Sequence, residues 1–139
     1  MLYFIKGGNN MEELIRVVKE LQATTGRLDK ERILQENKDN DFIKRVFEFV
    51  YNPYVISGIS SKKLKKKVKS IGYHITQLDV LMEYLKKNNT GRDIDIATVQ
   101  GYLFFLTENE KEIVSQIVTK SLKIGCTAKT LNKVYGATI

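Results

Sequence analysis

Apolar residues recur every three or four positions through almost the whole of this 139-residue sequence. This spacing places them on one stripe of an α-helix, and no stretch shows the strict apolar–polar alternation of a half-buried strand. The stripes predict helices at about residues 10–23, 28–37, 42–50, 77–88 and 93–105. Two further helices are expected to begin at about residues 107 and 128. The expected fold is therefore all-α, a single compact domain of about seven to eight helices over residues 1–139.

Polar residues at the helix ends set several of the expected boundaries. Asn10 with Glu13, and Thr107 with Glu110, fit the capping-box pattern in front of an apolar run. The first helix is thus expected to begin near Asn10. Residues 1–9 include a Gly-Gly pair and are expected to form a loose N-terminal arm.

The same stripes predict which side chains face the core. Leu28, Ile33 and Leu34 are expected to point inward from the second helix, and Phe104 from the helix at 93–105. Thr76 is expected to cap the helix at 77–88.

Residues 120–136 look like the end of one helix, a turn at Gly125 and the start of another helix. Glycine suits the left-handed position just past a helix end, and Thr127 is a good N-cap for the helix that follows. The apolar stripe of that helix contains Ala128, Leu131, Val134 and Tyr135, whereas the opposite side contains Lys129, Thr130 and Lys133. Free backbone amides, a hydroxyl and lysines together predict an anion site, with a backbone phosphate as the expected anion. An ordinary helical corner with solvated lysines fits the same residues.

The formal net charge of +7 is concentrated in two segments that contain no acidic residue. Residues 60–70 contain six lysines, and residues 120–139 contain four. Such clustering is the electrostatic footprint of a protein that binds a polyanion. The first segment, with Lys62, Lys63, Lys65, Lys66 and Lys67, is expected to contribute to the site, although a solvated charged loop is an equal alternative.

The sequence offers little for catalysis. His74 is the only histidine and Cys126 the only cysteine, so neither a zinc site nor a nucleophile–histidine pair is expected. No phosphate-binding loop or dinucleotide fingerprint occurs. The chain is predicted to contain no catalytic residue, no metal and no cofactor. Its longest N-terminal apolar run, residues 2–5, is too short for a signal peptide or a membrane span, so a cytoplasmic protein without membrane contact is expected. The protein is also expected to be a monomer.

Two stretches carry a resemblance to a known family. Residues 33–47, and residues 122–127 followed by Asn132-Lys133-Val134-Tyr135, resemble the N-terminal domain of ATP-dependent DNA ligases of the T-even phage type. The resemblance covers the chain from about residue 12 to residue 139. It implies an all-helical domain that grips duplex DNA around a nick, while a nucleotidyltransferase domain and an OB-fold domain perform the chemistry.

The resemblance also implies roles for individual residues. Lys123, Gly125, Thr127, Lys129 and Lys133 match the turn of that family and are expected to contact phosphates. The two catalytic domains are absent from this chain, and no lysine here is followed by x-Asp-Gly, the pattern of the lysine that the family adenylates. The sequence fits both a truncated ligase and a stand-alone relative of such a domain. The catalytic domains of the ligase would then act in cis or in trans.

The predicted function is therefore non-sequence-specific binding of duplex DNA, including nicked duplex, through its phosphates, as the DNA-binding domain of such a ligase. The alternative is a helical protein–protein adaptor whose lysine cluster binds an acidic partner. A membrane-surface module would need a larger apolar face than Leu64 and Val68 provide. A self-contained enzyme is disfavoured because no nucleophile or metal ligands were identified.

Overall fold

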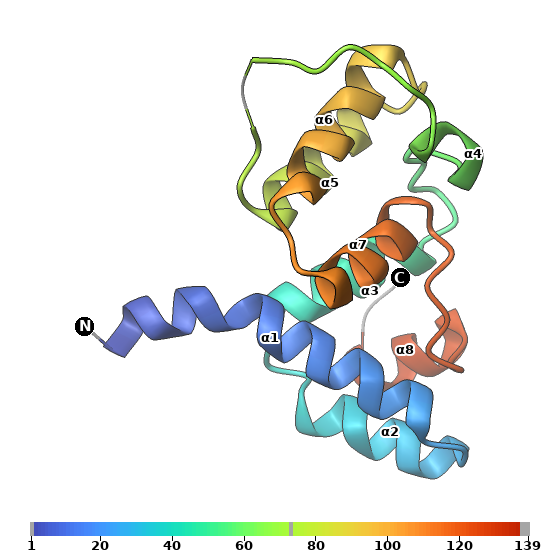
Figure 1. Ribbon diagram of the computed structural model, residues 1–139. Helices are drawn as coiled ribbons and strands as arrows, with labels where there is room; N and C mark the ends of the chain where they lie inside the picture. Colours follow the sequence, from blue (N-terminus) through green and yellow to red (C-terminus); the bar gives the residue numbers. More distant parts are fainter. Residues whose placement is uncertain (1, 73, 137–139) are drawn as a thin grey trace. The chain divides into compact units, whose positions relative to one another are not determined.

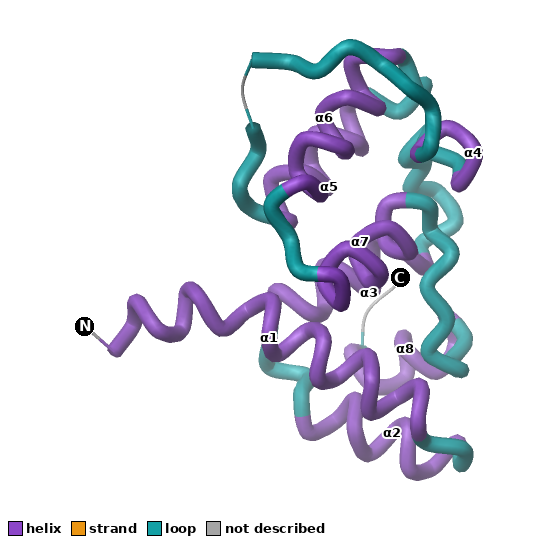
Figure 2. The backbone as a smooth tube through the Cα atoms, viewed as in Figure 1, coloured by secondary structure: helices purple, strands orange, loops and turns teal. Residues whose placement is uncertain are grey.

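The computed structural model describes residues 2–72 and 74–136, with side chains from Asn10 onward. Eight α-helices and no strand occur in this part of the chain (Figures 1 and 2). The prediction of an all-α fold with seven to eight helices is therefore confirmed. None of the helices in the described ranges combines the length and the apolar character that crossing a bilayer requires.

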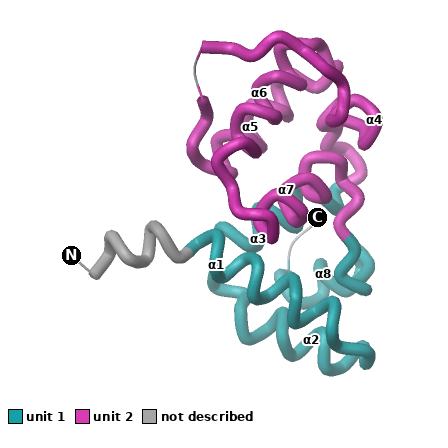
Figure 3. The backbone as a smooth tube through the Cα atoms, viewed as in Figure 1, with its two compact units in different colours: residues 1–52, 123–139 teal, residues 53–122 magenta. Residues whose placement is uncertain are grey.

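The contacts of the chain gather into two compact units (Figure 3). Unit 1 consists of residues 1–52 and 123–139, and unit 2 consists of residues 53–122. The beginning and the end of the sequence thus fold together, while the middle of the sequence forms a unit of its own.

Unit 1 contains α1 (Leu2–Ala23), α2 (Arg27–Glu36), α3 (Asp41–Tyr51) and α8 (Ala128–Tyr135). Helix α2 packs on both α1 and α8, and α3 packs on α1. The helices bury the apolar stripes that the sequence predicts. The fully buried side chains of this unit include Leu14, Leu21, Leu34, Ile43, Phe47, Phe49, Ile124 and Leu131.

The start of α1 corrects a prediction. The helix begins at Leu2 and continues through Gly7-Gly8, so the expected start at Asn10 is wrong and residues 2–9 are helical. Glycine and asparagine are weaker helix formers than alanine, which is why the local pattern favoured a later start. Met1 and the side chains of residues 2–9 lie outside the described part of the chain.

Unit 2 contains α4 (Ser61–Leu64), α5 (Leu78–Lys87), α6 (Asp93–Phe104) and α7 (Glu108–Val118). Helix α6 contacts each of the other three. The predicted capping box is present at the start of α7, where the Thr107 hydroxyl accepts from the Glu110 amide at 3.3 Å and the Glu110 carboxylate accepts from the Thr107 amide at 2.9 Å. The most deeply buried apolar side chains of this unit include Leu81, Leu85, Val99, Ile113, Val114, Ile117 and Val118.

Three further predictions are wrong in detail. Gln77, not Thr76, is the N-cap of α5, and its side chain makes no capping hydrogen bond. Leu28 and Phe104, expected in the core, are 71% and 73% exposed. Each lies near a helix end, where a residue on the apolar stripe can extend past the neighbouring elements.

Helix α7 also ends earlier than the sequence predicts. Its last residue is Val118, and the chain turns at Lys120, which has a φ of 56° in the left-handed region. The Ser115 carbonyl near this helix end accepts from the Thr119 amide at 3.2 Å and from the Thr119 hydroxyl at 2.8 Å. Gly125 is therefore not at the end of a helix but in the extended connection that precedes α8.

Candidate nucleic-acid interface

The connection at residues 123–127, here called the Gly125 loop, is held to the helices of unit 1 by three side chains. Gln22 of α1 donates to the Lys123 carbonyl at 2.9 Å, and the Tyr51 hydroxyl of α3 accepts from the Ile124 amide at 3.3 Å. The third is Lys30 of α2. The Ile124 side chain is fully buried. The loop is therefore held both by hydrogen bonds to its backbone and by the packing of this side chain.

Lys30 is a buried lysine, only 8% exposed. Its ammonium donates to the Leu21 carbonyl near the end of α1 at 2.5 Å and to the Ile124 carbonyl at 3.0 Å. A buried charge is stable only when it is well hydrogen-bonded, and carbonyl oxygens serve as acceptors here. Lys30 therefore joins α1, α2 and the Gly125 loop, and its role in this unit is structural.

Gly125 is required for two reasons. Its φ of +73° lies in the left-handed region, which glycine adopts without strain. In addition, a Cβ atom on this residue would lie 2.6 Å from the Lys30 Nζ and 2.9 Å from its Cε. The sequence predicted that Gly125 matters because it would follow a helix end. The structure gives another reason, which is the short distance between residue 125 and the Lys30 side chain.

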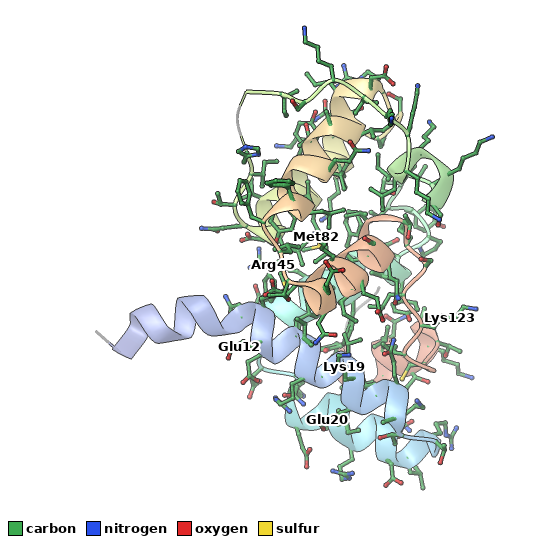
Figure 4. All side chains as sticks on the ribbon, viewed as in Figure 1. Glu12, Lys19, Glu20, Arg45, Met82 and Lys123 are labelled. Carbon is green, nitrogen blue, oxygen red and sulfur yellow. The ribbon has the colours of Figure 1, made fainter. Side chains whose placement is uncertain are left out.

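Helix α8 follows the prediction closely. The Thr127 hydroxyl accepts from the Thr130 amide at 3.3 Å and so caps the helix. Leu131 and Val134 are buried, whereas Lys129 and Lys133 are exposed. Lys123 is exposed on the loop that leads into α8 (Figure 4). Unit 1 therefore brings together all five of the residues that the sequence predicts around this turn.

The charges around this turn are only partly neutralised. The Lys133 ammonium lies 3.4 Å from both carboxylate oxygens of Glu31. Lys123 and Lys129 have no ion-pair partner among the residues described.

Burial raises the pKa of the Cys126 thiol, although the Lys30 ammonium acts in the opposite direction, so the thiolate form is not favoured.

The predicted lysine cluster lies in unit 2, on α4 and the segment after it. The Ser60 hydroxyl caps α4 by accepting from the Lys63 amide at 3.1 Å. The Gln100 side chain of α6 donates to the Leu64 and Lys66 carbonyls at 3.1 and 2.7 Å. The helix ends after one turn, as expected for a run of like charges, and α6 holds the segment that follows.

Two lysines of this cluster are engaged within unit 2. The Lys66 ammonium forms an ion pair with Asp93 at 2.8 Å, and the Lys63 ammonium donates to the Thr90 carbonyl at 3.3 Å. Lys62, Lys65 and Lys67 are exposed and make no ion pair within the described ranges. This group belongs to unit 2, whereas Lys123, Gly125, Thr127, Lys129 and Lys133, here called the Gly125 group, belong to unit 1.

The start of α6 contains a buried carboxylate, that of Asp95. Asp95 is fully buried and accepts from the Arg92 side chain and amide at 3.0 to 3.1 Å and from the Tyr84 hydroxyl at 2.7 Å. Burial works against its charge, but the hydrogen bonds from Arg92 and Tyr84 outweigh this, so the pKa of Asp95 is lower than usual. The carboxylate acts as a structural cap for α6.

Sequence reasoning missed the side chains that hold these segments in place. Gln22, Lys30, Tyr51 and Gln100 are far in sequence from the segments that they bind, and their residue types gave no signal. Lysine in particular is expected at the surface.

No group of three or more histidine, cysteine, aspartate or glutamate side chains in the described part of the chain could hold a metal ion.

Comparison with known proteins gives distant similarities. No known protein-family profile matches the sequence. The chain is 21% identical over 126 residues to the DNA ligases of Enterobacteria phages T4 and T6, which is 88% of this chain and 26% of each ligase. It is also 25% identical over 135 residues to an uncharacterised protein of Plasmodium falciparum, covering 92% of this chain and 13% of that protein. The chain thus spans about a quarter of the length of the ligases that it matches.

Proposed function

We propose that this chain binds duplex DNA without sequence specificity and corresponds to the DNA-binding domain of an ATP-dependent DNA ligase. The observation that carries this proposal is the similarity to two phage DNA ligases across 88% of the chain. The exposed lysines of the two acid-free segments supply the chemistry that such binding needs.

The Gly125 group is the first set of proposed contacts. Lys123 and Lys129 extend into solvent without ion-pair partners among the described residues, and Thr127 presents its hydroxyl at the start of α8. The hydrogen bonds of Gln22, Lys30 and Tyr51 fix the backbone from which these groups project. Less conformational entropy is then lost when the loop binds an anion.

The lysine cluster of unit 2 is the second set. Lys62, Lys65 and Lys67 would contact phosphates directly, whereas Lys66 would exchange its surface ion pair with Asp93 for one with a phosphate. Because exposed ion pairs contribute less than about 1 kcal/mol, this exchange is not costly. Phosphate contacts fit a ligase, which must join ends of any sequence.

The proposal leaves the joining reaction to other domains. A nucleotidyltransferase domain and an OB-fold domain, in the same protein or in another chain, would supply it. The chain itself would act as a cytoplasmic monomer that holds a nicked duplex.

Fluorescence anisotropy of a labelled nicked duplex, measured over a range of NaCl concentrations, tests the proposal. If about five lysines contact phosphates, the slope of log K against log salt should be about −4 to −5. Changing Lys123, Lys129 and Lys133 together to alanine should weaken binding and make the slope less steep by about two to three.

A matched control separates a local site from the effect of net charge. Changing Lys19, Lys87 and Lys111 to alanine removes the same charge from positions outside the two acid-free segments, and should have a much smaller effect. Equal effects of the two triple variants would refute the proposed site. Absence of binding at low salt would refute the DNA-binding function and favour the protein–protein adaptor.

A further inference from the structure

Unit 2 contains a cavity of about 370 Å³ at the end of α6 that the proposed phosphate contacts do not use. Its described walls come from residues 70, 71 and 74 and from the last two turns of α6. The residues that give it its apolar character and shape are Ile71, His74, Ala97, Gly101, Phe104 and Phe105. The volume is at the lower end of the range for small-molecule sites.

The aromatic rings at this cavity are unusually exposed. Phe104 and Phe105 are 73% and 69% exposed, and their ring centroids lie 5.0 Å apart in an edge-to-face arrangement. The His74 ring meets Phe105 edge-to-face at 5.1 Å. Two adjacent exposed phenylalanines leave a large apolar area in water, which in a soluble domain commonly marks a binding surface.

Gly101 allows His74 to reach this position. A Cβ atom at residue 101 would lie 3.1 Å from the His74 Nδ1, so a side chain here would crowd the imidazole.

The electrostatic surroundings identify the class of ligand. None of the described residues that line the cavity has a carboxylate, and Ser70, which is one of them, follows directly after the lysine-rich segment. Gln100 lines the cavity as well and donates to the Lys66 carbonyl at 2.7 Å, so it ties the lysine segment to the cavity wall. Lys67 and Lys69 are exposed nearby in sequence. An aromatic group attached to a phosphate complements both parts of this surface.

We propose that the cavity receives the base of an unpaired nucleotide in the bound DNA. The base would stack on the face of one of the two phenylalanine rings and contact the edge of the other, and the adjacent phosphates would contact the lysines that precede Ser70. This inference rests on the proposed DNA-binding function and deepens it, because it adds recognition of unpaired bases near the joined end. An unpaired base costs the least to remove from the helical stack.

Three nicked duplexes of the same length test the inference by fluorescence anisotropy. One is fully paired, one has an unpaired 2-aminopurine beside the nick, and one has an abasic residue at that position. The protein should bind the 2-aminopurine duplex about tenfold more tightly than the abasic duplex, since base–aromatic stacking has an effect of this order. The fluorescence of the 2-aminopurine should change on binding, because the base leaves the quenching helical stack and enters the cavity.

Two variants locate the effect. Changing Phe104 and Phe105 together to alanine should abolish the preference and leave the affinity for the fully paired duplex unchanged. Ile94→Ala, which removes an exposed apolar side chain of α6 outside the cavity, should retain the preference. Thermal unfolding of both variants, followed by circular dichroism, should show that they remain folded.

The two proposals fail in distinguishable ways. Equal affinity for the three duplexes, or a preference that persists without both phenylalanines, would overturn the base-binding cavity alone. No binding to any duplex at low salt would overturn the DNA-binding function together with it.

Discussion

Replacing Gly125 with alanine should destabilise the protein by about 2 to 4 kcal/mol. Alanine at a φ of +73° costs about 1 to 2 kcal/mol because its Cβ atom clashes with the backbone in the left-handed region. The Cβ would also lie 2.6 Å from the buried Lys30 Nζ. Lysine ends are flexible, but this one is held by the Leu21 and Ile124 carbonyls, so moving it weakens hydrogen bonds from a charged donor. Such bonds contribute about 1.5 to 3 kcal/mol each, and partial loss brings the total to this range.

Urea denaturation followed by circular dichroism measures this effect. Gly136→Ala is a matched control, because Gly136 also has a positive φ, +64°, but no atom of the described residues lies within 4 Å of its added Cβ. The control variant should lose only about 1 to 2 kcal/mol, which is the backbone contribution alone. The difference between the two variants then reports the contact with Lys30.

A double variant tests the cause directly. Lys30→Met keeps much of the apolar stem but removes the ammonium, so Gly125→Ala should cost less in that background than in the wild type. Equal losses for Gly125→Ala and Gly136→Ala, or no coupling between residues 30 and 125, would refute the argument.

Two other predictions follow from the charged groups. Asp95→Asn should lower the stability by about 2 to 3 kcal/mol at neutral pH, because the hydrogen bonds from Arg92 and Tyr84 lose their charged acceptor. Since the pKa of Asp95 is lower in the folded protein, its contribution is complete above the unfolded pKa of about 3.9 and is lost as the pH falls through the folded pKa. Urea denaturation at several pH values should therefore show a shallower loss below pH 4 for the variant, and equal slopes would contradict this. Glu31→Gln should tighten DNA binding by about two- to fivefold, because it frees Lys133 from a competing carboxylate. Glu36→Gln, which removes the partner of Arg32 and not of a proposed contact, is the control in the same anisotropy assay, and an equal gain would contradict the role of Lys133.

The sequence predicts helices well where apolar stripes and caps agree. Helix α3 is an example, since Phe47 and Val50 lie on its stripe and Pro53 follows its end. Prediction failed at α1, where a Gly-Gly pair lies inside a helix, and at α7, which ends at Val118 although the apolar stripe continues to Leu122. In both places local propensity and the folded structure disagree.

The candidate site was predictable only in its local part. Thr127 and the lysines of α8 follow from spacing along one helix, and the structure places them as expected. The supports of the Gly125 loop were not predictable, because they depend on contacts between residues up to 101 positions apart. A buried lysine that donates to backbone carbonyls has no pattern in the sequence. The one sequence feature connected with the buried Lys30 is Gly125, which has no Cβ atom to collide with the lysine side chain.

The pairing of Lys30 with Ile124, 94 residues later, has a consequence for how the chain folds as it is synthesised. The residues of unit 2 are contiguous and leave the ribosome together, whereas unit 1 lacks α8 and one acceptor of its buried ammonium until the residues that follow unit 2 have been made. Helices α1, α2 and α3 must therefore wait, with the face of α2 that packs on α8 still in water, until α8 has been made. In the newly made chain, the middle of the sequence is ready to fold before its beginning.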